Sequence, residues 1–438
     1  MSFVRRGILW IVALFCMSCA LAESRLCVAA DGCAALLGMD GAVIVAPGLY
    51  TDIFCLVDGE RYAVGLDVEN GRRYGLCDDS GALLTEIAYE MLAEMDGVIL
   101  YRQNGLYGAM NSDGEVLLDA AYTQLVPGGD GCFLALTTDP NDDSADLIWL
   151  VNPEEDEPQS TGIRTDNGLQ RIAEDRMPFR TPDTERYGCL NGAGELALKA
   201  AFDYVDGFVN GSARASTDGG RFGVIDAAGT WRIAAEYDFL ERGNGIFVGL
   251  AGRERCVVYD ESSFEELFRL EGVNLRVAAV GSRTILVDDS GMRIYSEAGR
   301  LLLEAGGSAT VSRGAGDQLI LYDGDWGEKC ASIIDANGAV FERKDQYLLP
   351  LDEDRYAFMT MNVASYYSEA LGSIRYSCDY DSIRFGMMNA SGEEILPAEA
   401  LEIRRLAARR YLTVAEDGLR VVDENGETLW SRLIEKEE

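Results

Sequence analysis

The chain has 438 residues, with 38 Lys and Arg against 74 Asp and Glu, and a formal net charge of −36 at pH 7. This acidity argues against a nucleic-acid partner, because a protein that neutralises phosphates needs a basic face. The chain contains no histidine, which excludes Ser-His and Cys-His catalysis and histidine-ligated metals. A hydrophobic content of 48% is ample for a packed core and excludes global disorder.

Residues 1–22 have the three parts of a secretory signal. Two arginines precede an apolar run that is too short to span a bilayer, and Ala-Leu-Ala follows, so we expect cleavage before Glu23. An uncleaved anchor and a lipoprotein attached through Cys19 are less favoured alternatives. No later segment approaches ~18 consecutive apolar residues. We therefore expect an exported protein, extracellular or associated with the cell envelope, with no membrane span after cleavage.

Nine cysteines follow this signal, at irregular spacings and without a Cys-x-x-Cys motif, which excludes zinc-finger and thioredoxin-type sites. Export would permit disulfides, and Cys27 could pair with Cys33 or Cys55. Cysteines at apolar strand positions are more often small core residues. This interpretation is favoured because Cys77 and Cys189 hold related places within a repeat. The nine are Cys27, Cys33, Cys55, Cys77, Cys132, Cys189, Cys256, Cys330 and Cys378.

The sequence contains an internal repeat. Five segments share an aromatic-Gly pair and a second glycine seven residues after the aromatic. They are Tyr74-Gly75 with Gly81, Tyr107-Gly108 with Gly114, Tyr187-Gly188 with Gly194, Phe222-Gly223 with Gly229, and Phe385-Gly386 with Gly392. In four of the five, an aromatic returns eight residues after the second glycine: Tyr89, Tyr122, Phe202 and Tyr237.

Weaker copies extend this repeat along the chain. Four segments keep only the spacing, and their second glycines are Gly41, Gly299, Gly338 and Gly426. Decayed copies at 146–162 and 256–271 fill the two longest gaps. Residues 23–438 therefore form one repeat region of about eleven units of about 38 residues, with insertions near 139–146 and 363–380.

Each unit is predicted to consist of short strands and tight turns. In the best copy, Phe222–Asp226 is an apolar strand, Asp226–Gly229 a turn and Thr230–Ala234 a second strand. Asp opening the turn and Gly closing it are typical of a type I turn followed by a residue with positive φ. The glycine after the aromatic marks a close backbone approach or a bulge. Only 398–408 has the pattern of a helix.

The unit resembles the WG repeat of bacterial proteins, with Tyr or Phe mostly replacing its Trp. The closest copy is Phe222–Asp238 (FGVIDAAGTWRIAAEYD). The resemblance implies an all-β repeat architecture and a binding or structural role, and it supplies no catalytic residues.

From the repeat we predict an all-β fold of tandem β-hairpin units. A propeller-like closed ring is preferred because closure removes exposed edges. Two smaller rings and an open array remain alternatives. The last unit, Arg410–Trp430, lacks the pattern of a final strand, so the N-terminal segment is predicted to complete a blade there.

Acidic clusters offer weak candidates for metal and glycan chemistry. Four carboxylates within 139–146 could bind Ca²⁺, as could those at 352–354 and 379–381, but such runs are usually solvated surface loops. Paired carboxylates could serve a glycosidase, yet 74 acids make accidental pairs certain. Tyr366 and Tyr367 could stack on a glycan. The repeated aromatics are expected to be core between units.

We therefore expect no catalytic residues and no cofactor. The predicted function is a non-catalytic exported scaffold that binds a protein or peptide through variable loops. The alternative is a carbohydrate-binding or glycoside-processing propeller.

Overall fold

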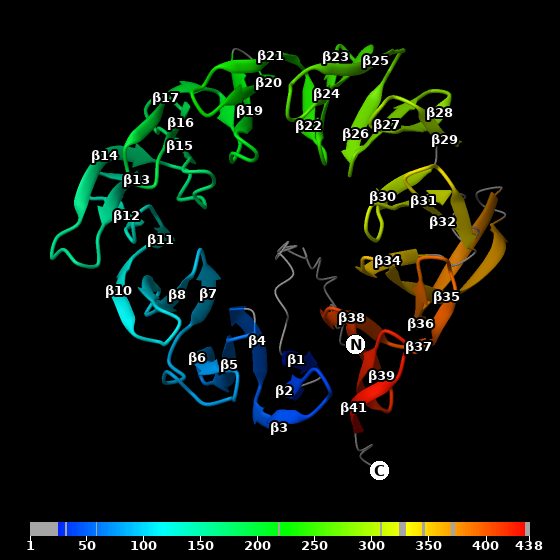
Figure 1. Ribbon diagram of the computed structural model, residues 1–438, viewed down its shortest axis with the longest axis horizontal. Coiled ribbons are helices and arrows are strands. Elements are labelled where there is room, and N and C mark those ends of the chain that lie inside the picture. Colours follow the sequence, from blue (N-terminus) through cyan, green and yellow to red (C-terminus); the bar gives the residue numbers. More distant parts are fainter. Residues whose placement is uncertain are drawn as a thin grey trace.

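The computed structural model is a single ring of eleven small antiparallel sheets arranged as the blades of a β-propeller (Figure 1). It describes residues 25–433 except 31–32, 58, 218–219, 307–308, 324–329, 344–346 and 369–372. The predicted signal at 1–22 lies outside the described residues. The single ring confirms the all-β propeller and excludes the two-ring and open-array alternatives.

Blades 1 to 4 cover the first part of the ring. Their strands are β1 (Arg25–Ala30), β2 (Cys33–Gly38) and β3 (Val43–Tyr50); β4 (Asp52–Val57), β5 (Arg61–Val68) and β6 (Gly71–Asp78); β7 (Met91–Met95), β8 (Val98–Gln103), β9 (Leu106–Met110) and β10 (Val116–Tyr122); and β11 (Gln124–Pro127), β12 (Phe133–Asp139), β13 (Asp142–Val151) and β14 (Gln159–Thr165).

Blades 5 to 8 follow in the same order. Their strands are β15 (Met177–Arg180), β16 (Tyr187–Leu190) and β17 (Leu196–Phe202); β18 (Tyr204–Val205), β19 (Ser212–Thr217), β20 (Arg221–Asp226) and β21 (Trp231–Tyr237); β22 (Phe239–Arg242), β23 (Ile246–Ala251), β24 (Arg255–Asp260) and β25 (Glu266–Glu271); and β26 (Arg276–Val280), β27 (Arg283–Asp288), β28 (Gly291–Tyr295) and β29 (Leu301–Ala305).

Blades 9 to 11 complete the ring. Their strands are β30 (Thr310–Arg313), β31 (Leu319–Asp323), β32 (Cys330–Ile334) and β33 (Val340–Arg343); β34 (Tyr347–Asp352), β35 (Arg355–Ser368), β36 (Ser373–Asn389) and β37 (Glu394–Ala400); and β38 (Glu402–Ala407), β39 (Arg410–Ala415), β40 (Gly418–Asp423) and β41 (Thr428–Leu433). The decayed copies at 146–162 and 256–271 form the outer halves of blades 4 and 7.

The core consists of apolar clusters between neighbouring blades. Each of eleven clusters of described residues joins one blade to the next, because a single blade is too thin to bury both of its faces alone. One of them closes the ring by packing Leu26 and Leu37 of blade 1 against Leu412 and Val421 of blade 11. The stability of each blade therefore depends on both of its neighbours.

The two chain ends build separate blades. Strand β41 pairs with β40 from Gly418↔Leu433 to Val422↔Thr428, so blade 11 has its own fourth strand. Strands β1–β3 pair only with one another and form blade 1. The prediction that the N-terminal segment completes the last unit is therefore wrong, because β41 runs beyond Trp430 and supplies that strand.

In nine units the second glycine lies in the turn that precedes the outermost strand, or the segment 83–89 that takes its place in blade 2, with φ between +75° and +85°. In blade 6, Gly229 N–H donates to the Asp226 carbonyl at 2.9 Å, and the Asp226 carboxylate accepts from Ala228 and Thr230 N–H at 3.0 Å each. A Cβ on Gly229 would lie 3.1 Å from Leu198 of the preceding blade. The turn glycine therefore satisfies the local turn and also permits close contact between blades.

The glycine after the aromatic faces a bulge in the outer strand. In blade 6 the register passes from Phe222↔Tyr237 to Val224↔Ile233, so two residues of β20 span the same length as four of β21. A Cβ on Gly223 would lie 2.5 Å from the Ile233 carbonyl oxygen. The equivalent distance is 2.6 Å for Gly188 and Leu198. This geometry explains why the aromatic is followed by glycine.

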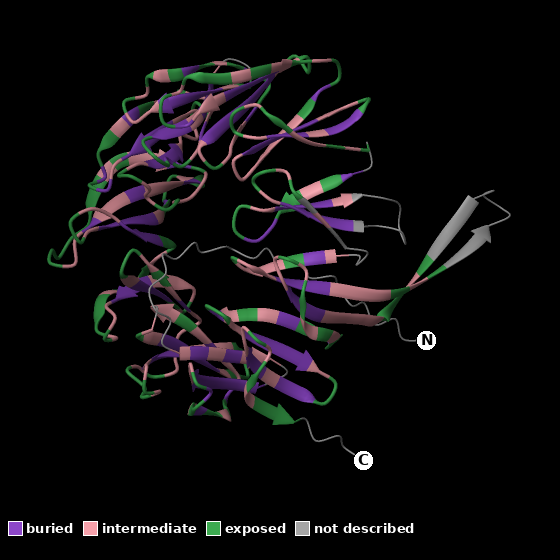
Figure 2. Ribbon diagram, turned by 45° about the vertical axis from the view of Figure 1, so that its right-hand side comes forward, coloured by how far each residue is buried: buried purple, intermediate pink, exposed green. Residues whose placement is uncertain are grey.

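Two further features differ from an ideal blade or from the sequence prediction. The insertion at 363–380 lengthens the β35–β36 hairpin, whose pairing continues to Ser368↔Ser373, so that it projects from the ring (Figure 2). The predicted helix at 398–408 is wrong. This segment contains the end of β37 and all of β38, and its apolar residues are divided among three interfaces between blades rather than forming one side of a helix. No helix occurs within the described residues.

The acidic insertion at 139–146 belongs to the β12–β13 hairpin and is neutralised by an arginine. Arg164 donates to Asp139 at 3.0 Å and to Asp142 at 2.6 Å, and it reaches Asp183 of blade 5 at 3.2 Å. Asp139 is only 6% exposed. The guanidinium therefore supplies the positive charge to two of the four carboxylates that were weak candidates for binding Ca²⁺.

We predict that Gly41→Ala lowers the free energy of unfolding by about 2–4 kcal/mol, through backbone strain and overpacking. Gly41 has φ +85°, and an added Cβ would clash with the Leu429 carbonyl of blade 11. The matched control is Gly48→Ala. Gly48 has φ +91° with nothing within 4 Å, so only strain of about 1 kcal/mol remains. Equal losses in urea denaturation would show that the closing contact contributes nothing.

We also predict that Arg164→Gln lowers the free energy of unfolding by about 1–3 kcal/mol, because Asp139 would remain buried without a cation. Arg269→Gln, which breaks an exposed pair with Glu266, should lower the free energy of unfolding by much less. EDTA should leave the Tm of the wild type unchanged, since no calcium ion is needed at 139–146. A drop in Tm with EDTA, restored by Ca²⁺, would contradict this account.

Candidate functional site

The repeat positions identified from sequence lie at the same place in different blades rather than in one site. Each aromatic-Gly pair is on the strand that leads into the turn with the second glycine: β6, β9, β16, β20 and β36. The aromatics Tyr74, Tyr107, Tyr187, Phe222 and Phe385 pack against the clusters between blades. These contacts favour the predicted role of the aromatics as core residues between units.

Three buried cysteines, Cys77, Cys189 and Cys256, are core residues rather than reactive thiols. Burial raises the pKa of the Cys77, Cys189 and Cys256 thiols to about 12, as expected for small core residues. Cys27 and Cys33 pack on opposite faces of blade 1, which excludes their pairing. Pairing of Cys27 with Cys55, which line one cavity of about 410 Å³, stays a prediction. The Cys330 side chain lies outside the described residues.

The other metal candidates among the described residues do not form a site. Asp352 accepts from Arg409 N–H at 3.0 Å and faces Arg405 Nε at 3.7 Å, so it serves the contact between blades 10 and 11. Within the part of the chain that the structure describes, no three His, Cys, Asp or Glu side chains are placed to hold a metal ion. The side chains of Tyr366 and Tyr367 lie outside that part.

The returning aromatics point to a site. Tyr89, Tyr122, Phe202 and Tyr237 each end the outer strand of a blade or its equivalent and pack against the next blade. In the fifth unit, the residue eight positions after Gly392 is Ala400. Its small side chain leaves unfilled the space that an aromatic ring takes elsewhere in the repeat.

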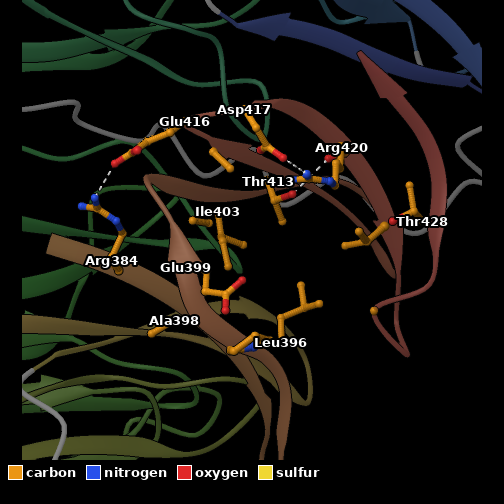
Figure 3. A pocket seen from close by; sticks show the side chains of 15 residues that line it. Arg384, Leu396, Ala398, Glu399, Ile403, Thr413, Glu416, Asp417, Arg420 and Thr428 are labelled. Carbon is orange, nitrogen blue, oxygen red and sulfur yellow. Dashed lines mark hydrogen bonds and ion pairs between the residues drawn. The ribbon is translucent and has the colours of Figure 1, made fainter. Parts of the chain in front are cut away.

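A cleft of about 630 Å³ lies at this position, between β37 of blade 10 and blade 11 (Figure 3). Leu396, Ala400, Ile403 and Val422 form its apolar lining. Gly426 in the turn of blade 11 still lies against Leu396, since an added Cβ would be 2.8 Å from that side chain. The two blades are thus held together at their rim, and the cleft lies beside Ala400, which is itself 7% exposed.

Charged side chains surround the opening of the cleft. Arg384 of β36 donates to Glu416 at 2.6 Å, and Arg420 of β40 donates to Asp417 (Figure 3). The exposed Glu399 carries a third carboxylate. Three acids against two arginines leave the cleft with a small negative charge on a strongly acidic protein. The arrangement suits a ligand with an apolar group and positive charge, and it offers no prepared nucleophile.

Sequence reasoning missed this site. Its lining comes from residues 384–428 on two blades, and no motif unites them. One signal in the sequence could have indicated the site. Among the five strong copies of the repeat, only the one that begins at Phe385 lacks the returning aromatic.

Comparisons with known proteins agree with the repeat. The family model described as "WG containing repeat" matches residues 187–220, which confirms the resemblance. A search of curated proteins found no significant match. No helix of the described residues is long and apolar enough to cross a membrane.

Similar solved structures include BamB from Moraxella catarrhalis, with 13% identity, 74% of this chain and 92% of that chain covered, and a TM-score of 0.28. Hsv2 of Kluyveromyces lactis has 10% identity, with 61% and 98% covered and a TM-score of 0.29. A eukaryotic initiation factor has 10% identity, with 74% and 96% covered and a TM-score of 0.40. The chain thus carries a WG repeat at 187–220 within an eleven-bladed β-propeller.

Proposed function

We propose that this protein is a non-catalytic scaffold, exported through the signal at 1–22, that binds a segment of another protein in the cleft between blades 10 and 11. The observation that carries the proposal is the cleft itself. It lies where one repeat unit replaces an aromatic by Ala400, while the remaining contacts of the interface are kept. Binding pockets combine an apolar lining with a few placed polar groups, as this one does.

The charge of the chain favours a basic partner segment. A net charge of −36 attracts cations over long range and repels acidic proteins and phosphates. Both arginines at the cleft are already engaged by Glu416 and Asp417. A ligand therefore meets a negative surface, with Glu399 available to pair with a lysine or arginine.

The same ion pairs weigh against the glycosidase alternative. A glycoside hydrolase needs two carboxylates free to act on the sugar from either side. Here Glu416 and Asp417 each hold an arginine, and only Glu399 stays available. A sugar could still enter the cleft as a ligand, so the test below includes glycans.

The test is capture from an envelope extract of the source organism by residues 23–438, immobilised as wild type, Ala400→Tyr or Leu401→Tyr. Ala400→Tyr should place a bulky ring in the cleft, and it should abolish capture of a protein that wild type retains. Leu401→Tyr adds the same ring at a neighbouring residue that is 41% exposed, and it should retain capture. Capture should also weaken as salt is raised from 50 to 500 mM, through screening of the charges.

Unchanged capture by Ala400→Tyr would place binding outside the cleft. Retention of glycan but not protein by the wild type would support the carbohydrate alternative instead. Both variants should keep the wild-type β-sheet circular dichroism and a Tm no lower than that of wild type by more than a few degrees, which separates loss of binding from loss of fold.

A further inference from the structure

The interface between blades 6 and 7 shows how a returning aromatic is held. Tyr237 is fully buried and packs against Leu240, Phe247 and Val257 of blade 7. A Cβ on Gly249 would lie 2.6 Å from the Tyr237 ring, so glycine is needed there for the ring to fit. Burial and the hydroxyl contact with Tyr259 raise the pKa of Tyr237, which keeps the phenol neutral. The ring therefore acts as a neutral wedge between the two blades.

The cleft has the same framework with different side chains. Ile403 follows Ala400 by three residues, as Leu240 follows Tyr237. The register pairs Leu240 with Gly249 in blade 7 and Ile403 with Thr413 in blade 11. Thr413 therefore stands in the place of Gly249.

One strand further out, Gly249 pairs with Val257 and Thr413 pairs with Arg420. Arg420 thus stands in the place of Val257. Tyr237 packs against Gly249 and Val257 of blade 7. The equivalent positions of blade 11 carry the hydroxyl of Thr413 and the guanidinium of Arg420.

These two replacements determine what the cleft can accept. Thr413 has a side chain where Gly249 has none, so a ring would enter less deeply than Tyr237 does. The Arg420 guanidinium lines the cleft and is held by Asp417 (Figure 3). A guanidinium with a fixed orientation favours the face of an aromatic ring over an aliphatic side chain of similar size.

We propose that the partner segment inserts an aromatic side chain into the cleft, in the place that the repeat leaves vacant at Ala400, and that the ring stacks on Arg420. This inference rests on the proposed function, since it specifies the ligand of the same cleft. The ligand is thus an extended basic segment with a Tyr, Phe or Trp. The ring supplies the apolar contact with Ile403 and Leu396, and flanking lysines or arginines face Glu399.

The test uses two synthetic peptides, acetyl-Lys-Lys-Tyr-Lys-Lys-amide and acetyl-Lys-Lys-Leu-Lys-Lys-amide, titrated into residues 23–438 by calorimetry. The tyrosine peptide should bind the wild type at least about fivefold more tightly than the leucine peptide. Arg420→Gln should reduce this ratio to near one. Removing a cation changes the affinity for any lysine peptide, and the ratio within one variant cancels that effect. Ala400→Tyr should abolish binding of both peptides, and Leu401→Tyr should leave both unchanged.

The outcomes separate the two proposals. A ratio near one in the wild type overturns the aromatic inference, and the cleft remains the binding site if Ala400→Tyr still blocks both peptides. A high ratio that survives Arg420→Gln overturns the stacking on Arg420. Two outcomes overturn this inference and also count against the cleft as the binding site. One is peptide binding that persists in Ala400→Tyr. The other is no measurable binding of either peptide to the wild type at millimolar concentration.

Discussion

The contact between a turn in one blade and the outer strand of the preceding blade organises the whole ring. At nine turns a glycine with positive φ lies against a residue of the blade before it. The pairs are Gly41 with Leu429, Gly81 with Val45, Gly114 with Thr85, Gly194 with Thr161, Gly229 with Leu198, Gly299 with Phe268, Gly338 with Leu302, Gly392 with Phe341, and Gly426 with Leu396. The first pair joins blade 1 to blade 11, so ring closure uses the same contact as eight of the internal interfaces. No special closing strand is required.

This repeated contact allows one interface to change without losing the ring. Between blades 10 and 11 the pair of Gly426 with Leu396 is kept, and so is the cluster formed by Met387, Ile403 and Val422. Only the returning aromatic is absent, at Ala400. In a closed ring the neighbouring blades also restrain both sides of the altered interface, which limits how far it can collapse. A ligand site can therefore be placed between two blades at a small cost in stability.

The repeat spacing was sufficient to predict the fold but not the site. Glycines such as Gly81 and Gly229 have a local role in their turns, so their spacing reveals the units, including the two decayed copies. The errors occurred where the chain passes between blades. Residues 398–408 contribute apolar side chains to three interfaces between blades, and their apolar pattern imitates a helix. The cleft joins residues on β36, β37, β39 and β40, and its carboxylates cannot be distinguished from the other acids of the chain until the blades are placed side by side.

Arginine ion pairs hold neighbouring blades together, and the chain nevertheless keeps a large net negative charge. In the ion pairs of the described residues the cation is arginine, and several of these pairs join neighbouring blades, as Arg61 does with Asp113, Arg283 with Asp317, and Arg384 with Glu416. Arginine suits this task because its planar fork can hold a carboxylate through two hydrogen bonds while its stem packs on apolar surface. Since most acids have no such partner, the ring keeps a large negative field. At the cleft, Arg384 pairs with Glu416 of the next blade and Arg420 pairs with Asp417 of its own blade. Because each arginine is matched by a carboxylate, the electrostatic field at the cleft stays negative while a guanidinium face is still exposed to a ligand. The positively charged segment that we propose as partner would therefore be attracted by the whole ring and would meet, at Arg420, a cation whose face suits an aromatic ring.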